Sequence, residues 1–307
     1  MEAAEGRSNE CSARCLLARV KDLAAIGKGG FPRFTFESIT GDRGKMRALN
    51  VSDLWARRHL ATYLSANLIR RRYRQTAIGF LWAIVRALGL VAVFSYLFGT
   101  ISNLNSNIEM PFPLFVFCGV LAFDLFSNIV IGCANSIITN RPIVDRVYCP
   151  RLILPISAVL VAGFDFAIVL SLFALMFFVF GFVPSLNIVF APLIIIGVVL
   201  CGFALGLSLG AVAVWFRDVR FAVAYVLQLL MLVTPVGYAA SAVPTKFSFL
   251  VTLNPMAIMI EALRWSFFAT PLPSPLLIAA GVAEIGLMLG IGFWCFAMLE
   301  RAFADVI

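Results

Sequence analysis

The sequence predicts an all-α membrane protein whose chain crosses the bilayer six times. Of its 307 residues, 62% are hydrophobic and only 13% are charged, and the mean hydropathy is +0.97. A soluble domain usually carries about 25% charged residues. In addition, a cluster of arginines runs directly into the apolar segment 77–98, which is long enough to cross a bilayer as a helix. The cluster consists of Arg70, Arg71, Arg72 and Arg74.

The distribution of positive charge predicts which side of the membrane each loop faces. The formal net charge is +8, and 15 of the 24 lysines and arginines lie in the first 76 residues. With six spans and a cytoplasmic amino terminus, the cytoplasmic segments hold 21 of these residues and the outer segments hold 2. Because cytoplasmic loops are enriched in Lys and Arg, we expect both termini in the cytoplasm. This rule, together with contact to lipid headgroups, explains the charge better than nucleic-acid binding does.

Two segments precede the first predicted span. Residues 1–50 mix charge, glycine and short apolar runs without sustained periodicity, which is typical of a polar, disordered cytosolic extension. In 51–76, apolar and basic side chains alternate at helical spacing, so we expect an amphipathic helix in the cytoplasmic headgroup layer. Trp55 and Tyr63 are its expected interface anchors.

Residues 77–307 form one predicted transmembrane domain. Between the last two spans, 256–269 is apolar but too short to cross the bilayer, which favours an interfacial or re-entrant helix. Glu261 and Arg264 are three residues apart on this helix and could pair. The six predicted spans are 77–98, 111–135, 155–180, 188–216, 221–238 and 276–299.

Glycines recur every four residues within the fourth predicted span. They are Gly202, Gly206 and Gly210. A face made of small residues lets a second helix approach closely, so this pattern predicts tight helix packing and not a ligand site.

Four charged residues lie inside predicted spans, where they are costly in lipid and should face protein or water. Arg86 could pair with any of the three acids, and the sequence does not choose among them. Such residues could form buried structural pairs or line a polar channel, to which three aromatic residues are candidate contributors. The candidate channel residues are Arg86, Asp124, Asp165, Glu284, Tyr225, Tyr238 and Trp265.

The sequence contains no visible carrier of enzyme chemistry. It has no nucleotide-binding loop and no catalytic triad, and His59 is the only histidine. The seven cysteines lie mostly in apolar runs without a CxxC pair, so they are interpreted as small hydrophobic residues. We therefore expect no metal and no cofactor on this chain, and a transport or scaffolding role.

Five patches occur in a fixed order from about residue 55 to the end of the chain. They are RRRYRQTAIGFLWAIVRAL at 70–88, NRPIVDRVYCPRLILP at 140–155, WFRDVRFAVAYVLQLLMLVTPVGY at 215–238, LNPMAIMIEALRW at 253–265 and LERAFADVI at 299–307. In this order they resemble the membrane subunit of ABC-2 type exporters, in particular the permeases for lipid-linked polysaccharides such as O-antigen, capsule or teichoic acid.

The resemblance implies a homodimer in the bacterial inner membrane, bound to two copies of a separate ATPase that carries the ATP and Mg. It also implies that the arginine-rich helix is a gate where a lipid phosphate headgroup arrives. The loop 140–151 would dock in the ATPase, through Arg141, Asp145, Arg146, Tyr148 and Arg151. A second cytoplasmic turn holds Arg217, Asp218 and Arg220.

Three other functions remain open at this stage. The first is an ABC-2 permease for a drug or a lipid. The second is an ion-coupled carrier or channel that uses the buried charges, although no inverted repeat is evident. The third is a membrane-embedded glycosyl- or acyltransferase, against which the single histidine argues. Dependence on a partner ATPase would separate the ABC-2 permeases from the other two.

Overall fold

The computed structural model describes residues 58–74, 79, 81–101, 110–140, 151–216, 218–244, 246 and 248–300. Every regular element in these ranges is a helix, which confirms the all-α prediction for them. In chain order they are α3 (Arg58–Arg74), α4 (Leu81–Phe94), the π-helix η2 (Ser95–Ile101), α5 (Phe112–Thr139), α7 (Ile153–Phe180), the 3₁₀ helix η4 (Leu186–Phe190), α8 (Ala191–Trp215), α9 (Val219–Val233), η5 (Ala240–Ala242), α10 (Ser248–Thr252), α11 (Pro255–Phe268) and α12 (Pro275–Glu300).

Five helical segments of the described chain are long and apolar enough to cross a membrane. They are Leu81–Gly99, Phe112–Thr139, Ile153–Phe180, Leu186–Val214 and Pro275–Met298. Each coincides with a predicted span to within a few residues. Their outward surfaces carry large exposed apolar side chains such as Phe178 and Leu186, which suits contact with lipid.

The fifth predicted span, 221–238, is shorter in the structure than the sequence pattern indicates. Its helix, α9, has 15 residues and ends at Val233, below the length of a full crossing. Thr234 leaves the helix with a ψ of 137°, because the proline at position 235 disfavours the helical conformation of the residue before it. The sixth crossing therefore remains a prediction.

The first predicted span begins four residues later than expected. The helix starts at Leu81 instead of residue 77, and Gly79 ahead of it has a φ of +55°. A left-handed backbone at this position is easy only for glycine, and it separates α4 from the arginine-rich α3. The charged helix and the first span are therefore two elements.

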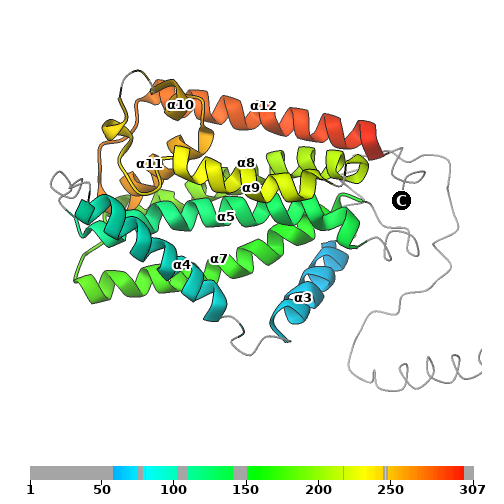
Figure 1. The fold of residues 1–307 in the computed structure, drawn as a ribbon, viewed down its shortest axis with the longest axis horizontal. Coiled ribbons are helices and arrows are strands. Elements are labelled where there is room, and N and C mark those ends of the chain that lie inside the picture. The colour runs from blue at the N-terminus through cyan, green and yellow to red at the C-terminus, as the bar shows by residue number, and fades with distance from the viewer. Residues whose placement is uncertain are drawn as a thin grey trace, which may run out of the picture. The chain divides into compact units, whose positions relative to one another are not determined.

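The long helices α5, α7, α8 and α12 run roughly along one common direction, with α11 near one end and α3 against α7 at the other (Figure 1). Helix α5 lies at the centre of this arrangement. In the most apolar 18-residue stretch of α5, 78% of the residues are buried, whereas the same stretch of the other four crossing helices has 17–28% of its residues buried. Its neighbours are thus the elements that meet the lipid.

The glycine face of α8 packs directly on α5, as the four-residue spacing predicts. A Cβ atom on Gly206 would lie 2.7 Å from Cys133 Cβ, and one on Gly210 would lie 2.9 Å from the Cys133 carbonyl oxygen. A Cβ on Gly202 would meet Ile129 at 3.1 Å. These distances leave no room for a side chain, so the two backbones are in contact along this face.

Helix α11 lies within the protein, and most of its side chains are buried. Arg264 is 0% exposed, and its guanidinium lies 3.7 Å from the centre of the Phe115 ring on α5. It donates hydrogen bonds to the carbonyl oxygens of Val236 and Tyr238 and to Glu261, at 2.7, 3.1 and 3.1 Å. The expected pairing of Glu261 with Arg264 is confirmed, but the arginine faces the protein interior.

The amino end of α11 is also tied to the segment after α9. The Asn254 side chain accepts a hydrogen bond from Met256 N, which caps the helix. The same side chain donates to Thr234 Oγ1 at 2.8 Å. Through Asn254 and Arg264, α11 holds the chain that follows α9 at two points.

Replacing Gly206 by valine should separate α5 from α8. Overpacking of a close contact costs about 1–3 kcal/mol, so the midpoint of thermal unfolding of the purified protein should fall clearly. Gly290→Val on α12 is the matched control, since nothing lies within 4 Å of a Cβ at that position. Equal midpoints for the two variants would contradict the backbone contact.

Replacing Arg264 by methionine should destabilise the fold strongly. The change removes the donor of the Val236 and Tyr238 carbonyl oxygens and leaves Glu261 without its positive partner, with only the Ala240 N–H still donating to it. Breaking a buried ion pair costs about 3–5 kcal/mol. The measurement is unfolding in a graded denaturing detergent. Lys246→Met, at an exposed position, is the control and should change stability little.

Candidate functional site

Helix α3 has one buried face, and its predicted position in the cytoplasmic headgroup layer stays a prediction. Ala61, Leu64 and Ser65 are buried on one face, which packs on α7, whereas Tyr63 is exposed. The last turn carries Arg71, Arg72 and Arg74, where positive charge is favourable to the helix dipole. All four arginines of the predicted gate have exposed side chains. Among them, only Arg72 also lines the cavity that lies between α3, α5 and α7.

Arg72 and Tyr73 both bind Asp165, a residue in the middle of α7. Arg72 Nη1 lies 2.6 Å from Asp165 Oδ2, and the Tyr73 hydroxyl donates to the other carboxylate oxygen. The Asp165 side chain is 2% exposed, whereas that of Arg72 is 48% exposed. The buried carboxylate therefore has two donors from α3, and this cluster, which we call the α3 latch, fixes the helix on α7.

Tyr73 is a hydrogen-bond donor throughout the physiological pH range. Burial, the hydrogen bond to Asp165 and the negative charge of that carboxylate raise the pKa of the Tyr73 phenol to about 12. Its ring is also tilted against Phe164 at 6.0 Å. The Tyr73 phenol therefore keeps its proton at neutral pH and can donate to Asp165.

Arg86 pairs with Asp124, which answers the question that the sequence left open. Arg86 Nη2 lies 2.9 Å from one carboxylate oxygen and 3.0 Å from the other. The Asn128 amide donates a further hydrogen bond to Asp124 at 2.9 Å. This ion pair joins α4 to α5.

A polar stripe runs along α5 on the side away from α8. Residues spaced by 3.6 per turn share one face. Positions 124, 128, 135 and 139 therefore lie half a turn from positions 126, 130 and 133, which meet the α8 glycines. Asn135, a member of this stripe, accepts a hydrogen bond from Arg220 Nε of α9 at 3.0 Å.

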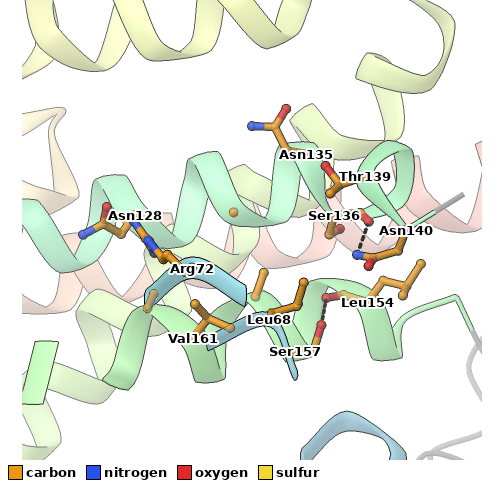
Figure 2. Close-up of a pocket in the computed structure, with 13 residues that line it drawn as sticks. Leu68, Arg72, Asn128, Asn135, Ser136, Thr139, Asn140, Leu154, Ser157 and Val161 are labelled. Atoms are coloured by element: carbon orange, nitrogen blue, oxygen red, sulfur yellow. Dashed lines mark hydrogen bonds between the residues drawn. The ribbon is translucent and has the colours of Figure 1, made fainter. Parts of the chain in front are cut away.

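A cavity of about 280 Å³ opens between α3, α5 and α7. Figure 2 shows Arg72 beside Asn128 at one end and Ser136 with Asn140 at the other. The hydroxyls of Ser136 and Ser157 donate to carbonyls of their own helices. The lining residues are Leu68, Arg72, Asn128, Gly132, Asn135, Ser136, Thr139, Asn140, Leu154, Ser157, Ala158, Val161 and Ala162.

The structure brings only part of the predicted site together. Arg72 pairs with Asp165 between α3 and α7, Arg86 pairs with Asp124 between α4 and α5, and Arg220 binds Asn135 between α9 and α5. Glu284 on α12 is separate from them, and its Oε2 is buried without a hydrogen-bond partner among the described residues. The predicted docking residues Arg141, Asp145, Arg146 and Tyr148, together with Trp55 and Arg217, lie outside the described residues.

The remaining predicted residues lie away from the cavity. Tyr225 has an exposed side chain on α9. The Tyr238 hydroxyl donates to Val233 O at 2.8 Å, and Trp265 packs its ring against Phe190. Arg151 precedes α7 with a partly buried side chain, and Asp218 is exposed. Their proposed channel and docking roles stay predictions.

Sequence reasoning missed the residues that complete the polar contacts. Tyr73, Asn128, Asn135 and Ser157 were not among the predicted site residues. The two asparagines give a usable signal, since they fall on one helical face with Asp124 in an otherwise apolar helix. No group of three or more potential metal ligands lies in the part of the chain that the structure describes.

Five apolar helices of crossing length define a polytopic membrane protein, and a largely apolar cavity with a few polar groups lies between two of them and α3. The chain belongs to the ABC-2 type transporter family, whose model matches residues 60–268. Members of this family are membrane transport subunits, so the chain is a transport protein.

Curated relatives of known name cover most of the chain. An O-antigen export system permease protein RfbA of Klebsiella pneumoniae is 29% identical over 198 residues, which are 64% of this chain and 75% of the relative. A second Klebsiella pneumoniae protein of that name is 29% identical over 201 residues, 65% of this chain and 76% of its own. The Myxococcus xanthus protein of the same name is 30% identical over 240 residues, 76% of this chain and 91% of its own.

A double-mutant cycle on Arg72→Gln and Asp165→Asn should reveal direct coupling in the α3 latch. Contacting residues in one hydrogen-bonded network typically couple by about 0.5–3 kcal/mol in the free energy of unfolding. Arg71→Gln combined with Asp165→Asn is the matched control and should give a value near zero. Additive effects in the first cycle would contradict the ion pair.

Proposed function

We propose that this chain is the permease subunit of an ATP-driven exporter that moves a lipid-linked polysaccharide of the O-antigen type outward across a bacterial inner membrane. The observation that carries this proposal is the agreement among relatives. Three proteins named as O-antigen export permeases align with 64–76% of the chain. The family match, which spans residues 60–268, supports the same assignment.

The ATP would be hydrolysed on a separate subunit. A permease of this family works in an ABC exporter, and we propose that two copies of the chain associate with two copies of that ATPase. The basic loop 140–151 would dock in the ATPase, with both termini of the chain on the same, cytoplasmic side. The charge distribution of the sequence supports this orientation.

The polar contacts of the bundle favour a structural use of its charges over an ion pathway. Arg86 is paired with Asp124, and Asp165 is bound by Arg72 and Tyr73. Buried charges in membrane helices are costly unless they are paired in this way. These two pairs thus explain four of the charges in and near the predicted spans without a coupled ion.

The direct test is ATPase activity in lipid, measured on the purified chain alone and with the ATPase encoded beside it. We expect activity only in the complex, and a change in rate when an O-antigen precursor linked to its lipid is added. No binding of the ATPase, together with flux driven by a proton gradient alone, would overturn the proposal.

The docking loop can be tested in the same assay. Arg146→Glu with Arg151→Glu should lower ATPase stimulation at least tenfold, because reversing the charge of a docking loop disrupts its electrostatic match to the partner. Lys246→Glu, an exposed charge reversal on the predicted outer side, should leave stimulation unchanged. Equal stimulation in both variants would remove the docking role, provided that membrane insertion is intact.

A further inference from the structure

The first crossing segment ends in a helix of a different type. Its regular part, α4, passes at Ser95 directly into η2, a π-helix of seven residues. An α-helix bonds each N–H to the carbonyl four residues earlier, whereas a π-helix bonds it to the carbonyl five residues earlier. Each π turn therefore holds about one residue more than an α turn. Single π turns within α-helices are frequently found at functional sites.

Phe98 of η2 packs on the chain that follows α9. A Cβ atom on Gly237 would lie 2.7 Å from Phe98 Cδ2 and 2.8 Å from Phe94 Cδ1, so both rings touch the glycine backbone. The two rings stack on each other, with centroids 5.7 Å apart and an angle of 8° between their planes. The Tyr238 ring also lies 5.7 Å from the Phe98 ring. Phe98 thus joins the end of the first span to this segment.

The segment after α9 gives Phe98 a fixed surface. The carbonyls of Val236 and Tyr238, on either side of Gly237, accept hydrogen bonds from the buried guanidinium of Arg264. Arg264 belongs to α11, most of whose side chains are buried within the protein. Because the glycine is held in this way from the protein interior, we expect any change in its contact with Phe98 to come from η2.

Ser95 indicates that η2 has a second conformation available to it. Four other serines are buried in the described helices, and the hydroxyl of each donates to the carbonyl three residues earlier. They are Ser65, Ser136, Ser157 and Ser266. Ser95 Oγ is also buried, but it has no hydrogen-bond partner among the described residues. In a continuous α-helix the same hydroxyl can donate to the Ala92 or Val91 carbonyl, so the α conformation offers a hydrogen bond that the π conformation lacks.

We propose that η2 is a two-state closure at the end of the first span that is farther from α3 along the chain. In the π conformation Phe98 rests on Gly237 and Tyr238, and the closure is shut. Conversion to an α-helix moves the last turn by the step of one residue, about 100° around the axis and about 1.5 Å along it. This step withdraws Phe98 from Gly237. The inference rests on the proposed function, in which this end of the permease opens to release the exported polymer.

Distances between two spin labels test the movement in the complex with its ATPase, reconstituted in lipid. The labels are unnatural amino acids, so the native cysteines stay in place. One label replaces Leu253, and the other replaces Leu97 of η2 or, as the control, Val93 of α4; all three side chains are exposed. Trapping the ATPase with ATP and vanadate should change the 97–253 distance by about 5 Å or more, since the side chains lie about 5–6 Å from the helix axis. The 93–253 distance should change much less. Equal changes in both pairs, or no change in either, would overturn the proposal.

Deleting Tyr96 removes the additional residue of the π turn and keeps Phe98 on Gly237. ATP-driven movement of a lipid-linked O-antigen precursor in proteoliposomes should fall at least tenfold, while the midpoint of thermal unfolding stays within a few degrees of the parent protein. Tyr96→Ala is the matched control, because it keeps the length of the helix and removes only an exposed side chain; its transport should change little. Equal transport by the two variants would contradict the closure. A much lower midpoint for the deletion would show that the fold requires the residue, and would contradict it too.

Gly237→Ala tests the closure on the permease without its ATPase. The added methyl group takes the place of the two rings, so the 97–253 distance should change as it does on trapping. Gly286→Ala on α12 is the control, since nothing lies within 4 Å of a Cβ at that position. An unchanged distance in Gly237→Ala would refute the closure. Glycan-dependent ATPase activity without any movement of the label at 97 would refute this inference alone, whereas the Gly237→Ala change in a chain that binds no ATPase would refute the proposed function alone.

Discussion

Contact between the backbones of α5 and α8 is the constraint on which the rest of the bundle depends. The glycines at 202, 206 and 210 leave no space for side chains against α5, and this fixes the rotation of α5 about its own axis. Once that rotation is set, the opposite side of α5 must point toward α3, α7 and α9. Asp124, Asn128 and Asn135 lie on that opposite side, and this places the polar contacts and the cavity.

The polar contacts tie together helices that have few other reasons to hold a fixed position. In lipid, apolar helices gain no hydrophobic energy by association, so packing and hydrogen bonds between helices decide their arrangement. Arg86 links α4 to α5, Arg220 links α9 to α5, and Asp165 links α7 to α3. Each of these three links joins an outer helix to the central helix α5 or to its neighbour α7.

The sequence predicts the helices of this fold well and their partners poorly. Hydropathy and length identify five crossing helices, and the glycine spacing identifies a packing face, because both properties are local. The apolar run predicts a helix up to residue 238, five residues beyond the end of α9, because Pro235 ends the helix inside that run. The choice of Asp124 as the partner of Arg86, and of Asp165 as the partner of Arg72 and Tyr73, depends on which helices are adjacent, and no local pattern contains that information.

The short helix α9 has a consequence for the position of nearby backbone in the bilayer. Fifteen helical residues rise about 22 Å, less than the hydrocarbon thickness of about 30 Å. If α9 begins at one membrane surface, the non-helical chain after Thr234 lies at hydrocarbon depth, where peptide groups find no water. Such backbone is tolerated only when protein satisfies it. The hydrogen bonds from Arg264 to the carbonyls of Val236 and Tyr238 thus replace solvent, and they let the chain turn before it reaches the opposite surface.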